Sequence, residues 1–272
     1  GNITDKKIYK QLSKFKIDIV YHLAAQSASE TAYDDIKFDI LTNIYGSYLI
    51  ANFCLENKIN KLIYSSSVAV YGSSLNKVKE SKIKKPDSIY GVSKFSGELI
   101  IKQTLKNTPT NYTIFRLFNV YGPGENLNFI KKGIVSIYLS YVWKKQPIII
   151  KGNIGRFRDF IFIDDVIEAF IIAINTKNSI NKTYNLGYGK KTSVKELLKI
   201  IFKVFKLKKD YKLEILEETP GDSFSFYSDI SKIKSDLKWK PKYSLLKGIK
   251  EYHKWIKKVP VKKNLENFHP LK

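Results

Sequence analysis

The sequence contains no methionine, a single cysteine and no long apolar run. Cys54 has no partner within the chain, which excludes an intrachain disulfide, and its apolar neighbours favour a buried, inert thiol. No stretch approaches the roughly 18 uninterrupted apolar residues of a transmembrane helix, so we expect no membrane insertion. The first residues also lack the apolar core of a signal peptide. With 43% hydrophobic and 14% aromatic residues, the composition predicts an ordered globular protein, which we expect to be cytoplasmic.

Acidic residues are scarce: 25 stand against 48 basic residues, and the formal net charge is +23. Such an excess can indicate nucleic-acid binding. The lysines, however, are spread along the whole chain, and no zinc-finger spacing or RNA-binding motif accompanies them. A chain-wide bias toward lysine explains the charge. We therefore expect no specific nucleic-acid partner, and the sequence predicts no metal site.

Arginine is rare in this lysine-rich chain and occurs only at Arg116, Arg156 and Arg158. A planar, bidentate donor that is kept against a strong preference for lysine indicates a geometric need, such as recognition of a phosphate or a carboxylate. The alternative is a buried ion pair. The sequence favours that alternative most for Arg116 and least for Arg158.

The first half of the chain alternates short apolar strands with longer helical segments. Strands are expected at residues 16–22, 61–65 and 112–117, and helices at 34–58 and 90–107. Such alternation builds parallel βαβ units, so the predicted fold class is α/β, with a doubly wound parallel sheet of the Rossmann type. Ligands bind at the carboxyl ends of the strands in these sheets.

Three segments directly follow or end these strands: residues 23–25, 65–67 and 118–119. We expect them to converge at one edge of the sheet. The second half is less regular, with Ser193 as a candidate N-cap. Its expected helices span residues 133–144, 164–175, 194–205, 229–237 and 245–257, and its expected strands span 148–150 and 183–186. We therefore divide the chain into a partial Rossmann domain, residues 1–122, and a smaller α/β substrate lobe, residues 123–272, with a return to the first domain near residues 155–190.

Tyr90 and Lys94 form the most informative pair in the sequence. Four residues apart on a helix, their side chains lie on one face, and a nearby ammonium favours a phenolate. This combination is suited to moving a proton on and off a sugar hydroxyl. The same spacing also occurs at Tyr33–Lys37, Tyr141–Lys145 and Tyr243–Lys247. What distinguishes Tyr90 is therefore its context, beginning with Ser67, which lies 23 residues earlier.

An ordered set of motifs spans nearly the whole chain. The motifs are HLAA at 22–25, Asn43 with Gly46, SSSVAVYG at 65–72, YGVSK at 90–94, RLFNVYGPG at 116–124, RDFIFIDD at 158–165, YNLG at 184–187, PGD at 220–222 and WKP at 239–241. Together they resemble the extended short-chain dehydrogenase/reductase superfamily, within it the NAD-dependent nucleotide-sugar epimerase/dehydratase family, and most closely the UDP-glucose 4-epimerase-like members.

The resemblance implies a role for each matched residue. Ser67 would hydrogen-bond the reacting sugar hydroxyl, Tyr90 would be its acid and base, and Lys94 would hold the nicotinamide ribose and lower the pKa of the tyrosine. The residues implied to line the NAD cofactor, besides Tyr90 and Lys94, are Asn2, Ile3, Leu23, Ala24, Ala25, Asn43, Ser65 and Phe118. In the same way, Asn119 and Arg158 would hold the sugar-nucleotide diphosphate, and Asp222 a ribose hydroxyl.

Several positions depart from the family pattern. The dehydratase branch carries an Asp-Glu pair after its serine or threonine; here Val68 and Ala69 stand in that place and cannot transfer protons, which disfavours 4,6-dehydration. Thr219 replaces a usual arginine, Lys151 an aromatic residue that stacks on the base, and Phe226 a tyrosine. These changes leave the base and the sugar open.

The largest departure is at the start of the chain. Members of the family open with a strand and a glycine-rich turn whose amides hold the cofactor pyrophosphate. Nothing here resembles that turn, and residues 1–5 instead resemble the segment after the third strand, with Asn2 and Ile3 in the adenine-contacting positions. We expect that this N-terminal segment is missing and that the chain alone binds NAD poorly.

The leading hypothesis is a UDP-hexose 4-epimerase that uses NAD, a transient 4-keto sugar and Tyr90. A keto-sugar reductase or epimerase-reductase of the same family is an alternative, and a truncated, non-catalytic sugar-nucleotide-binding relative is another. The resemblance also implies a homodimer formed through the helices near residues 34–58 and 90–107.

Overall fold

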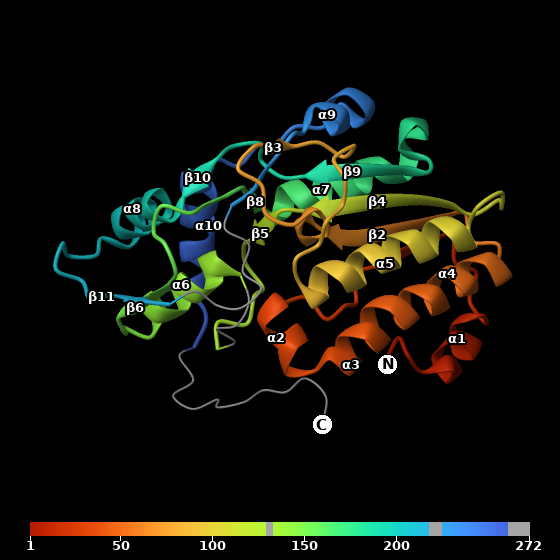
Figure 1. The fold of residues 1–272 in the computed structure, drawn as a ribbon, viewed down its shortest axis with the longest axis horizontal. Helices are drawn as coiled ribbons and strands as arrows, with labels where there is room; N and C mark the ends of the chain where they lie inside the picture. The colour runs from red at the N-terminus through yellow and green to blue at the C-terminus, as the bar shows by residue number, and fades with distance from the viewer. Residues whose placement is uncertain (129–132, 218–224, 261–272) are drawn as a thin grey trace.

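The computed structural model describes residues 1–128, 133–217 and 225–260. Its central feature is a parallel sheet of four strands in the order β1-β2-β4-β9 (Figure 1). The strands are β1 (Ile19–His22), β2 (Lys61–Ser67), β4 (Asn111–Leu117) and β9 (Lys182–Leu186). The fold class is thus α/β with a Rossmann-type parallel sheet, as the alternation of strands and helices predicted.

Helices cover both faces of this sheet. α4 (Gly46–Glu56) and α5 (Ile89–Thr104) lie on one face, and α7 (Ile163–Asn175) lies on the other (Figure 1). Because successive side chains of a strand point to opposite faces, Leu62 and Tyr64 join the apolar cluster under α4 and α5, while Ile63 joins the cluster under α7. Burial on both faces explains why consecutive residues are apolar in each strand, residues 62–64 in β2 and residues 114–115 in β4.

The helical region before β2 contains the helix expected over residues 34–58: residues 36–56 are helical without a break, with one π-helical turn among them, and a separate short helix precedes Asp35. The region consists of α2 (Ser29–Asp34), α3 (Ile36–Ile40), a π-helical turn (Leu41–Tyr45) and α4. Asp35 separates α2 from α3: its φ of −147° and ψ of 86° are not helical, and its carboxylate caps α3 by accepting a hydrogen bond from the Phe38 amide at 2.8 Å. Of the helices in the described ranges, none is long and apolar enough to cross a membrane.

The second half of the chain returns to the central sheet. β9 pairs in parallel with β4, in the register Thr113↔Lys182 to Leu117↔Leu186. After β9, α9 (Ser231–Leu237) packs in the same apolar cluster as α7, and the Trp239 indole donates a hydrogen bond to the Asp165 carbonyl at 3.0 Å. The sheet is therefore completed by residues that follow part of the second lobe.

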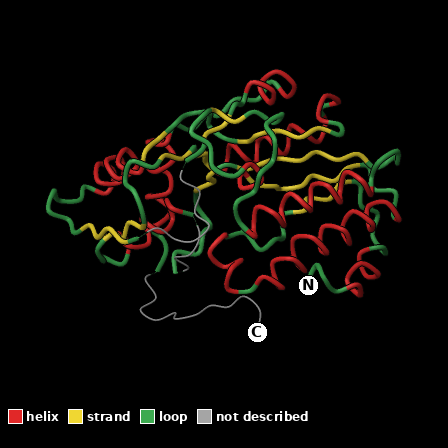
Figure 2. Tube along the Cα trace, viewed as in Figure 1, coloured by secondary structure: helices red, strands yellow, loops and turns green. Residues whose placement is uncertain are grey.

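Short strands join the two lobes beside the carboxyl edge of the sheet (Figure 2). The pairs are β3 (Lys77–Val78) with β12 (Tyr227–Ser228), β5 (Asn119–Tyr121) with β8 (Phe160–Phe162), and β7 (Phe157–Arg158) with β10 (Thr192–Ser193). Each pair links segments that are distant in the sequence. The remaining short elements are α1 (Lys6–Leu12) and the 3-10 turns Val68–Tyr71 and Lys177–Ser179.

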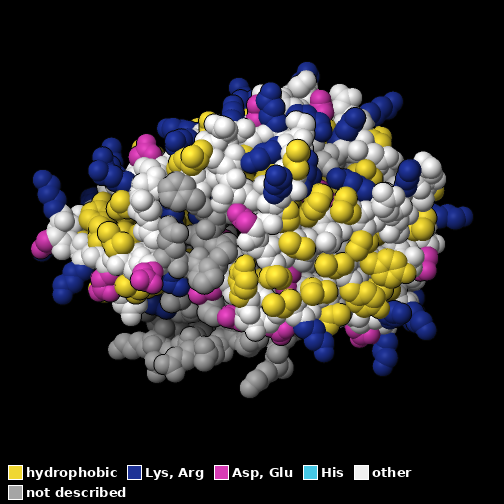
Figure 3. All heavy atoms as spheres, viewed as in Figure 1, with side chains coloured by type: hydrophobic (Ala, Val, Ile, Leu, Met, Phe, Trp, Pro, Cys, Tyr) yellow, Lys and Arg dark blue, Asp and Glu magenta, His cyan; other side chains and the backbone are white. Residues whose placement is uncertain are grey.

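One surface of the first lobe is apolar. Hydrophobic side chains gather over the helices α3, α4 and α5 (Figure 3). The exposed members of this apolar face are Ile36, Ile40, Leu41, Tyr48, Val92 and Leu99. A contiguous apolar surface of this kind marks an interaction site more often than scattered exposed residues do.

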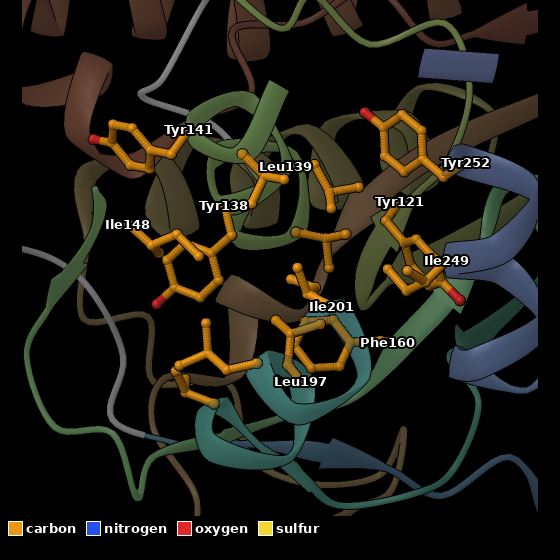
Figure 4. Packing of buried hydrophobic residues seen from close by; sticks show 14 of the residues in the cluster. Tyr121, Tyr138, Leu139, Tyr141, Ile148, Phe160, Leu197, Ile201, Ile249 and Tyr252 are labelled. Atoms are coloured by element: carbon orange, nitrogen blue, oxygen red, sulfur yellow. The ribbon is translucent and has the colours of Figure 1, made fainter. Parts of the chain in front are cut away.

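The second lobe has its own core. α6 (Ile134–Trp143), α8 (Val194–Phe205) and α10 (Leu245–Ile256) surround a buried cluster that includes Tyr138, Leu197 and Ile249 (Figure 4). β6 (Ile148–Lys151) and β11 (Leu213–Leu216) form a parallel pair at its periphery. The predicted N-cap of α8 is confirmed, because Ser193 and Glu196 form a reciprocal capping box.

Candidate active site

The carboxyl ends of three parallel strands form the floor of the candidate site. The register pairs His22 with Tyr64 and Ser67 with Leu117, so β1, β2 and β4 end along one edge of the sheet. The segments after these strands, residues 23–25 and 118–119, therefore emerge beside Ser67, as the sequence predicted. Ligands of open α/β sheets bind at this kind of edge.

Ser67 and Tyr90 meet because the start of α5 packs against the 3-10 turn, Val68–Tyr71, that follows β2. Ser67 caps this turn and accepts a hydrogen bond from the Ala69 amide at 3.2 Å, while Ser88 caps α5 by accepting one from the Gly91 amide at 3.1 Å. A Cβ atom at Gly91 would lie 2.5 Å from the Ala69 carbonyl oxygen, so only glycine permits this close approach. A side-chain hydrogen bond then links Tyr90 to Ser67.

Lys94 lies one helical turn after Tyr90 and is buried, with only 2% of its surface exposed. Its Nζ lies over the Tyr64 ring, 4.3 Å from the ring centroid, in cation–π geometry. Burial lowers the pKa of Lys94 to about 7, although the carboxylates of Glu98 and Asp39 raise it. Of the four Tyr–Lys pairs in the sequence, the pair of Tyr90 and Lys94 thus has its lysine in the protein interior beside the edge of the sheet.

The protonation of Tyr90 differs from the expectation that Lys94 lowers its pKa. Burial raises the pKa of Tyr90 to about 12, and the charge of Asp39 adds to this effect, while the hydrogen bond with Ser67 opposes it. The physical reason is desolvation, which disfavours the phenolate just as it disfavours the Lys94 ammonium. In this structure both groups are therefore biased toward their neutral forms.

Residues expected to line a cofactor are found at the same edge, next to β1. Leu23 is 53% exposed and Ala24 is exposed as well, while Ala25 is half-buried. Asn43 lies in the π-helical turn and is buried; its side chain accepts a hydrogen bond from the Gln26 amide and donates one to the Gln26 carbonyl, both at 3.0 Å. Asn43 thereby fixes the loop that carries the two alanines.

Ser65 and the first residues of the chain complete this side. The Ser65 hydroxyl donates a hydrogen bond to the His22 carbonyl at 3.2 Å. Asn2 accepts hydrogen bonds from the Thr4 amide and hydroxyl at 3.0 and 2.9 Å. Ile3 packs on Gly46, where a Cβ atom would lie 2.6 Å from the isoleucine side chain. Gly46 is three residues after Asn43, so the chain start lies against the same helical region.

The residues expected to hold a sugar nucleotide lie toward the second lobe. The Asn119 amide donates a hydrogen bond to the Asp159 carbonyl at 3.0 Å. Arg158 is buried, and its guanidinium lies 4.8 Å from the ring centroid of Phe226, which in turn packs edge-on against Phe118. Asp222, the expected ribose contact, lies outside the described residues, as does Thr219.

Arg116 has the role that the sequence favoured for it, a buried ion pair. Its guanidinium forms a buried, bidentate ion pair with Glu98, at 2.8 Å from Nε to Oε1 and 2.6 Å from the second nitrogen to Oε2. Arg116 also donates a hydrogen bond to the Tyr71 hydroxyl at 2.7 Å. The alternative of a buried ion pair is therefore confirmed for Arg116, and it joins β4 to α5 below Lys94.

Sequence reasoning missed the residues that support this constellation. Asp159 is fully buried, and its carboxylate accepts hydrogen bonds from the amides of Ser228, Tyr188 and Gly189. It therefore fixes the backbone next to Arg158. The signal available in the sequence was its position directly after Arg158. Its hydrogen-bond partners, however, come from segments that are distant in the sequence.

Asp39 and Lys151 were also missed in their observed roles. Asp39 is fully buried and accepts a hydrogen bond from Asn43 at 3.2 Å. The four-residue spacing of these two side chains on one helical segment was the available signal. Lys151, expected where an aromatic residue stacks on a base, forms an exposed ion pair with Glu30 at 3.3 Å.

Comparisons with known proteins agree with this geometry. The family model described as GDP-mannose 4,6 dehydratase matches residues 1–252. A Methanocaldococcus jannaschii protein that is named as a UDP-glucose 4-epimerase is 34% identical to this chain over 254 residues. The match covers 92% of this chain and 80% of that protein. The dTDP-4-dehydro-6-deoxyglucose reductase of Escherichia coli is 28% identical over 90% of this chain and 76% of its own length.

Solved structures give the same result. The UDP-glucuronic acid 4-epimerase of Bacillus cereus, in complex with UDP-glucuronic acid and NAD, superposes with a TM-score of 0.86 at 30% identity, over 95% of this chain and 80% of that one. The UDP-glucose 4-epimerase of Thermotoga maritima, with UDP-glucose, gives a TM-score of 0.89 at 28% identity, over 95% and 83%. The chain therefore belongs to the GDP-mannose 4,6 dehydratase family, among the nucleotide-sugar epimerases and dehydratases of the extended short-chain dehydrogenase/reductase superfamily.

Proposed function

We propose that this protein catalyses the NAD-dependent 4-epimerisation of a UDP-hexose through a transient 4-keto sugar. The observation that carries the proposal is the arrangement of Ser67, Tyr90 and Lys94 at the carboxyl edge of the sheet. The Tyr90 hydroxyl is hydrogen-bonded to Ser67, and the Lys94 ammonium lies one helical turn away. Two of the similar solved structures are named as a UDP-glucose 4-epimerase and a UDP-glucuronic acid 4-epimerase.

The residues at this edge fit a nicotinamide cofactor. Exposed Leu23 and Ala24 offer small, accessible backbone at a strand end, and Asn43 is held rigidly beside them. In the proposal Ala25, Ser65, Phe118, Tyr90 and Lys94 also hold the cofactor, with Asn2 and Ile3 at its adenine end. When bound, NAD would supply the hydride acceptor and donor for oxidation and re-reduction of the sugar carbon.

The protein's own groups handle the proton. Tyr90 Oη removes the proton of the sugar 4-hydroxyl as the carbon is oxidised, and it returns that proton when the carbonyl is reduced. Ser67 keeps the sugar oxygen within reach of Tyr90 by hydrogen bonding. Because burial raises the pKa of Tyr90 to about 12, the positive charge of Lys94 is needed to stabilise the phenolate.

Two neighbouring side chains support epimerisation over dehydration. Loss of water requires an acid and a base next to the sugar, and the positions after Ser67 are Val68 and Ala69, which cannot transfer a proton. Val68 is buried in an apolar cluster with Phe118 and Phe226. In the proposal Asn119 and Arg158 hold the diphosphate of the substrate, and Asp222 a ribose hydroxyl.

The test is a product analysis of the full chain with each of UDP-glucose, UDP-galactose and UDP-glucuronic acid; because we expect weak binding of NAD, its concentration is raised until the rate no longer increases. We expect interconversion of a pair of 4-epimers, measured by NMR of the sugar, with no net change in the amount of NAD. Tyr90→Phe should lower the rate by about 100- to 10,000-fold, the range of a lost acid–base group. Tyr33→Phe is the matched control, because Tyr33 has a lysine at the same spacing but is exposed. Equal rates in both variants would contradict the proposal.

A second candidate is a keto-sugar reductase or an epimerase-reductase. It is favoured by the 28% identity to the Escherichia coli dTDP-4-dehydro-6-deoxyglucose reductase. The two functions differ in redox balance: a reductase consumes one reduced cofactor for each product, while an epimerase returns its NAD unchanged. Absorbance at the reduced-nicotinamide band, recorded with a 4-keto sugar nucleotide, separates them.

We also propose that the protein forms a homodimer through the apolar face over α3, α4 and α5. Five of its exposed residues come from these three helices: Ile36, Ile40, Tyr48, Val92 and Leu99. Sedimentation equilibrium of the protein and of Leu99→Asp tests this assignment. We expect a dimer that dissociates in the variant, and a monomer in both samples would overturn it.

A further inference from the structure

Lys94 places its ammonium group against an aromatic ring in the protein interior. Its Nζ lies 4.3 Å from the centroid of the Tyr64 ring, and the two residues expose only 2% and 1% of their surfaces. Within the described ranges, no carboxylate forms an ion pair with this ammonium and no atom accepts a hydrogen bond from it. The face of the Tyr64 ring is therefore the group that meets the positive charge at contact distance.

The titratable groups around Lys94 come from several elements. Glu98 and Tyr90 share α5 with it, Asp39 belongs to α3 and His22 to β1. Glu98 and, to a smaller extent, Asp39 raise the pKa of Lys94 from outside ion-pair distance. The pKa of His22 is lowered to about 3 by burial, so this ring is neutral at physiological pH and does not repel the ammonium.

The Tyr64 ring is fixed by the elements around it. It belongs to the apolar cluster under α4 and α5, and the His22 ring of β1 stacks on it with centroids 5.2 Å apart. Its hydroxyl packs against α5, since a Cβ atom at Gly97 would lie 2.5 Å from the Tyr64 oxygen. Gly97 is three residues after Lys94. The helix that carries the lysine thus approaches the ring closely, and this packing sets the position of Lys94 over the ring.

Tyr64 attracts the ammonium through its ring and not through a charge. Burial raises the pKa of its hydroxyl well above the ordinary value, so Tyr64 stays a neutral phenol at physiological pH. The face of an aromatic ring carries partial negative charge and attracts a cation, and this attraction grows where water is excluded. Phenylalanine would present a similar face, whereas leucine would fill much of the space without one.

We propose that Tyr64 is a positioning residue of this site: the face of its ring holds the Lys94 side chain in place as an ammonium, one helical turn from Tyr90. A desolvated cation–π contact changes the ratio of ammonium to amine by about 3- to 30-fold. Because burial lowers the pKa of Lys94 to about 7, a change of this size decides how much of the protein carries the charge at neutral pH. The proposal deepens the proposed function and rests on it only for its catalytic consequence.

The test measures Lys94 directly, without turnover. The full chain is prepared with ¹³Cε-labelled lysine and titrated by NMR, and the Lys94 signal is identified by its loss in Lys94→Arg. We compare the wild type with Tyr64→Phe, which keeps the face of the ring, and with Tyr64→Leu, which removes it. Circular dichroism confirms that each variant is folded.

Tyr184→Leu is the matched control. Tyr184 is a buried tyrosine of the same sheet, and a lysine also lies over its ring, with Lys232 Nζ 5.0 Å from the centroid. It belongs, however, to the apolar cluster under α7, on the face of the sheet opposite to Tyr64. The control therefore removes a comparable ring and a comparable contact without touching Lys94.

We expect the midpoint of the Lys94 titration to fall by about one pH unit in Tyr64→Leu, a tenfold lower ratio of ammonium to amine. It should remain close to the wild-type value in Tyr64→Phe and in Tyr184→Leu. A midpoint that is unchanged or raised in Tyr64→Leu overturns the proposal. An equal fall in Tyr64→Phe or in Tyr184→Leu overturns it as well.

If Tyr64→Leu does not fold, the wild type and Tyr64→Phe carry the test. Lysine Hε protons that lie over the face of a ring are shifted upfield by its ring current and show nuclear Overhauser effects to the ring protons. We expect both signals for Lys94 at a pH below its midpoint, and their loss above it, when the amine is no longer attracted. Signals that are absent below the midpoint, or that do not change across it, overturn the proposal.

A catalytic readout separates this inference from the proposed function. If the protein is a 4-epimerase, Tyr64→Leu shifts the alkaline side of the pH profile of kcat to lower pH and leaves the KM of the nucleotide sugar near its wild-type value. Absence of epimerase activity in the wild type contradicts the proposed function but leaves the NMR result standing. The two proposals therefore fail independently.

Discussion

Replacement of Arg116 by methionine tests the buried ion pair below the site. Glu98 is fully buried, and Arg116 is 2% exposed. Arg116→Met preserves much of the side-chain volume but leaves the Glu98 carboxylate in the interior without its main partner. Removal of one member of a buried pair destabilises a protein by about 3–5 kcal/mol, because an uncompensated charge remains. We expect a loss of this size in the free energy of unfolding.

The sign of the pH dependence follows from the pKa of Glu98. Arg116 holds this pKa below its ordinary value of 4.5 even though burial acts in the opposite direction. In the wild type the pair therefore stabilises the fold above pH 4.5, and this contribution is lost as the pH falls through the lowered pKa. In Arg116→Met burial raises the pKa of Glu98, so the variant loses stability as the pH rises above 4.5. The difference between the two proteins should therefore widen from pH 4.5 to pH 7.

Urea unfolding followed by fluorescence of the three tryptophans measures this difference. The double variant Arg116→Met/Glu98→Gln is the control, since it removes the uncompensated charge as well. It should recover at least half of the lost stability at pH 7. The reasoning would be refuted if the double variant were no more stable than Arg116→Met and if the deficit were the same at pH 4.5 and pH 7.

Three further predictions follow from local geometry. Gly91→Ala places a Cβ atom 2.5 Å from the Ala69 carbonyl oxygen, so the start of α5 must shift; we expect at least a tenfold loss of epimerase rate and about 1–3 kcal/mol lower stability by urea unfolding. His22 stays neutral in the fold down to about pH 3 but takes up a proton near 6.5 when unfolded; the wild type should therefore lose about 2–3 kcal/mol between pH 7 and pH 4.5 from this residue, and His22→Asn should lose less in the same titration. Ser193→Ala removes the capping box with Glu196 and should lower the stability of the second lobe by about 1 kcal/mol, seen as a lower thermal midpoint in calorimetry.

The sheet and its functional edge were predictable because their signals are local. β2 and β4 contain short apolar runs followed by small or polar residues, and helices separate β1 from β2 and β2 from β4. These features depend on a few consecutive residues, and parallel strands bring their carboxyl ends to one edge whatever the details of packing. The N-cap of α8 was predictable for the same reason.

The two-residue strands that join the lobes were not predictable. β3 pairs with β12, and β7 pairs with β10, across long separations in the sequence. A pair of residues carries no readable periodicity, so such strands form only because the surrounding segments are already placed. The short helix α2 before Asp35 was not predicted for a related reason: the Asp35 side chain caps α3 and so separates the two helices, a local contact that competes with helix continuation.

The chemistry of the site could be predicted in its residues but not in its energetics. The motif identified Tyr90 and Lys94, yet their protonation depends on burial and on Asp39, Glu98 and Tyr64, which three-dimensional packing brings together. With a pKa raised to about 12, Tyr90 is almost entirely a neutral phenol at pH 7. A charged Lys94 is the group that can offset this, and its own pKa near 7 makes the charge incomplete.

These two titrations impose opposite demands on the proposed reaction. Formation of the Tyr90 phenolate is favoured as the pH rises, while the Lys94 ammonium that stabilises it is lost as the pH rises through about 7. The upper limit of the pH range in which both conditions are met is therefore set by the pKa of Lys94. The carboxylates of Glu98 and Asp39 raise that pKa against the effect of burial. A site that places its lysine in the interior, away from water, thus depends on the buried carboxylates of Glu98 and Asp39, which no motif of the sequence contains.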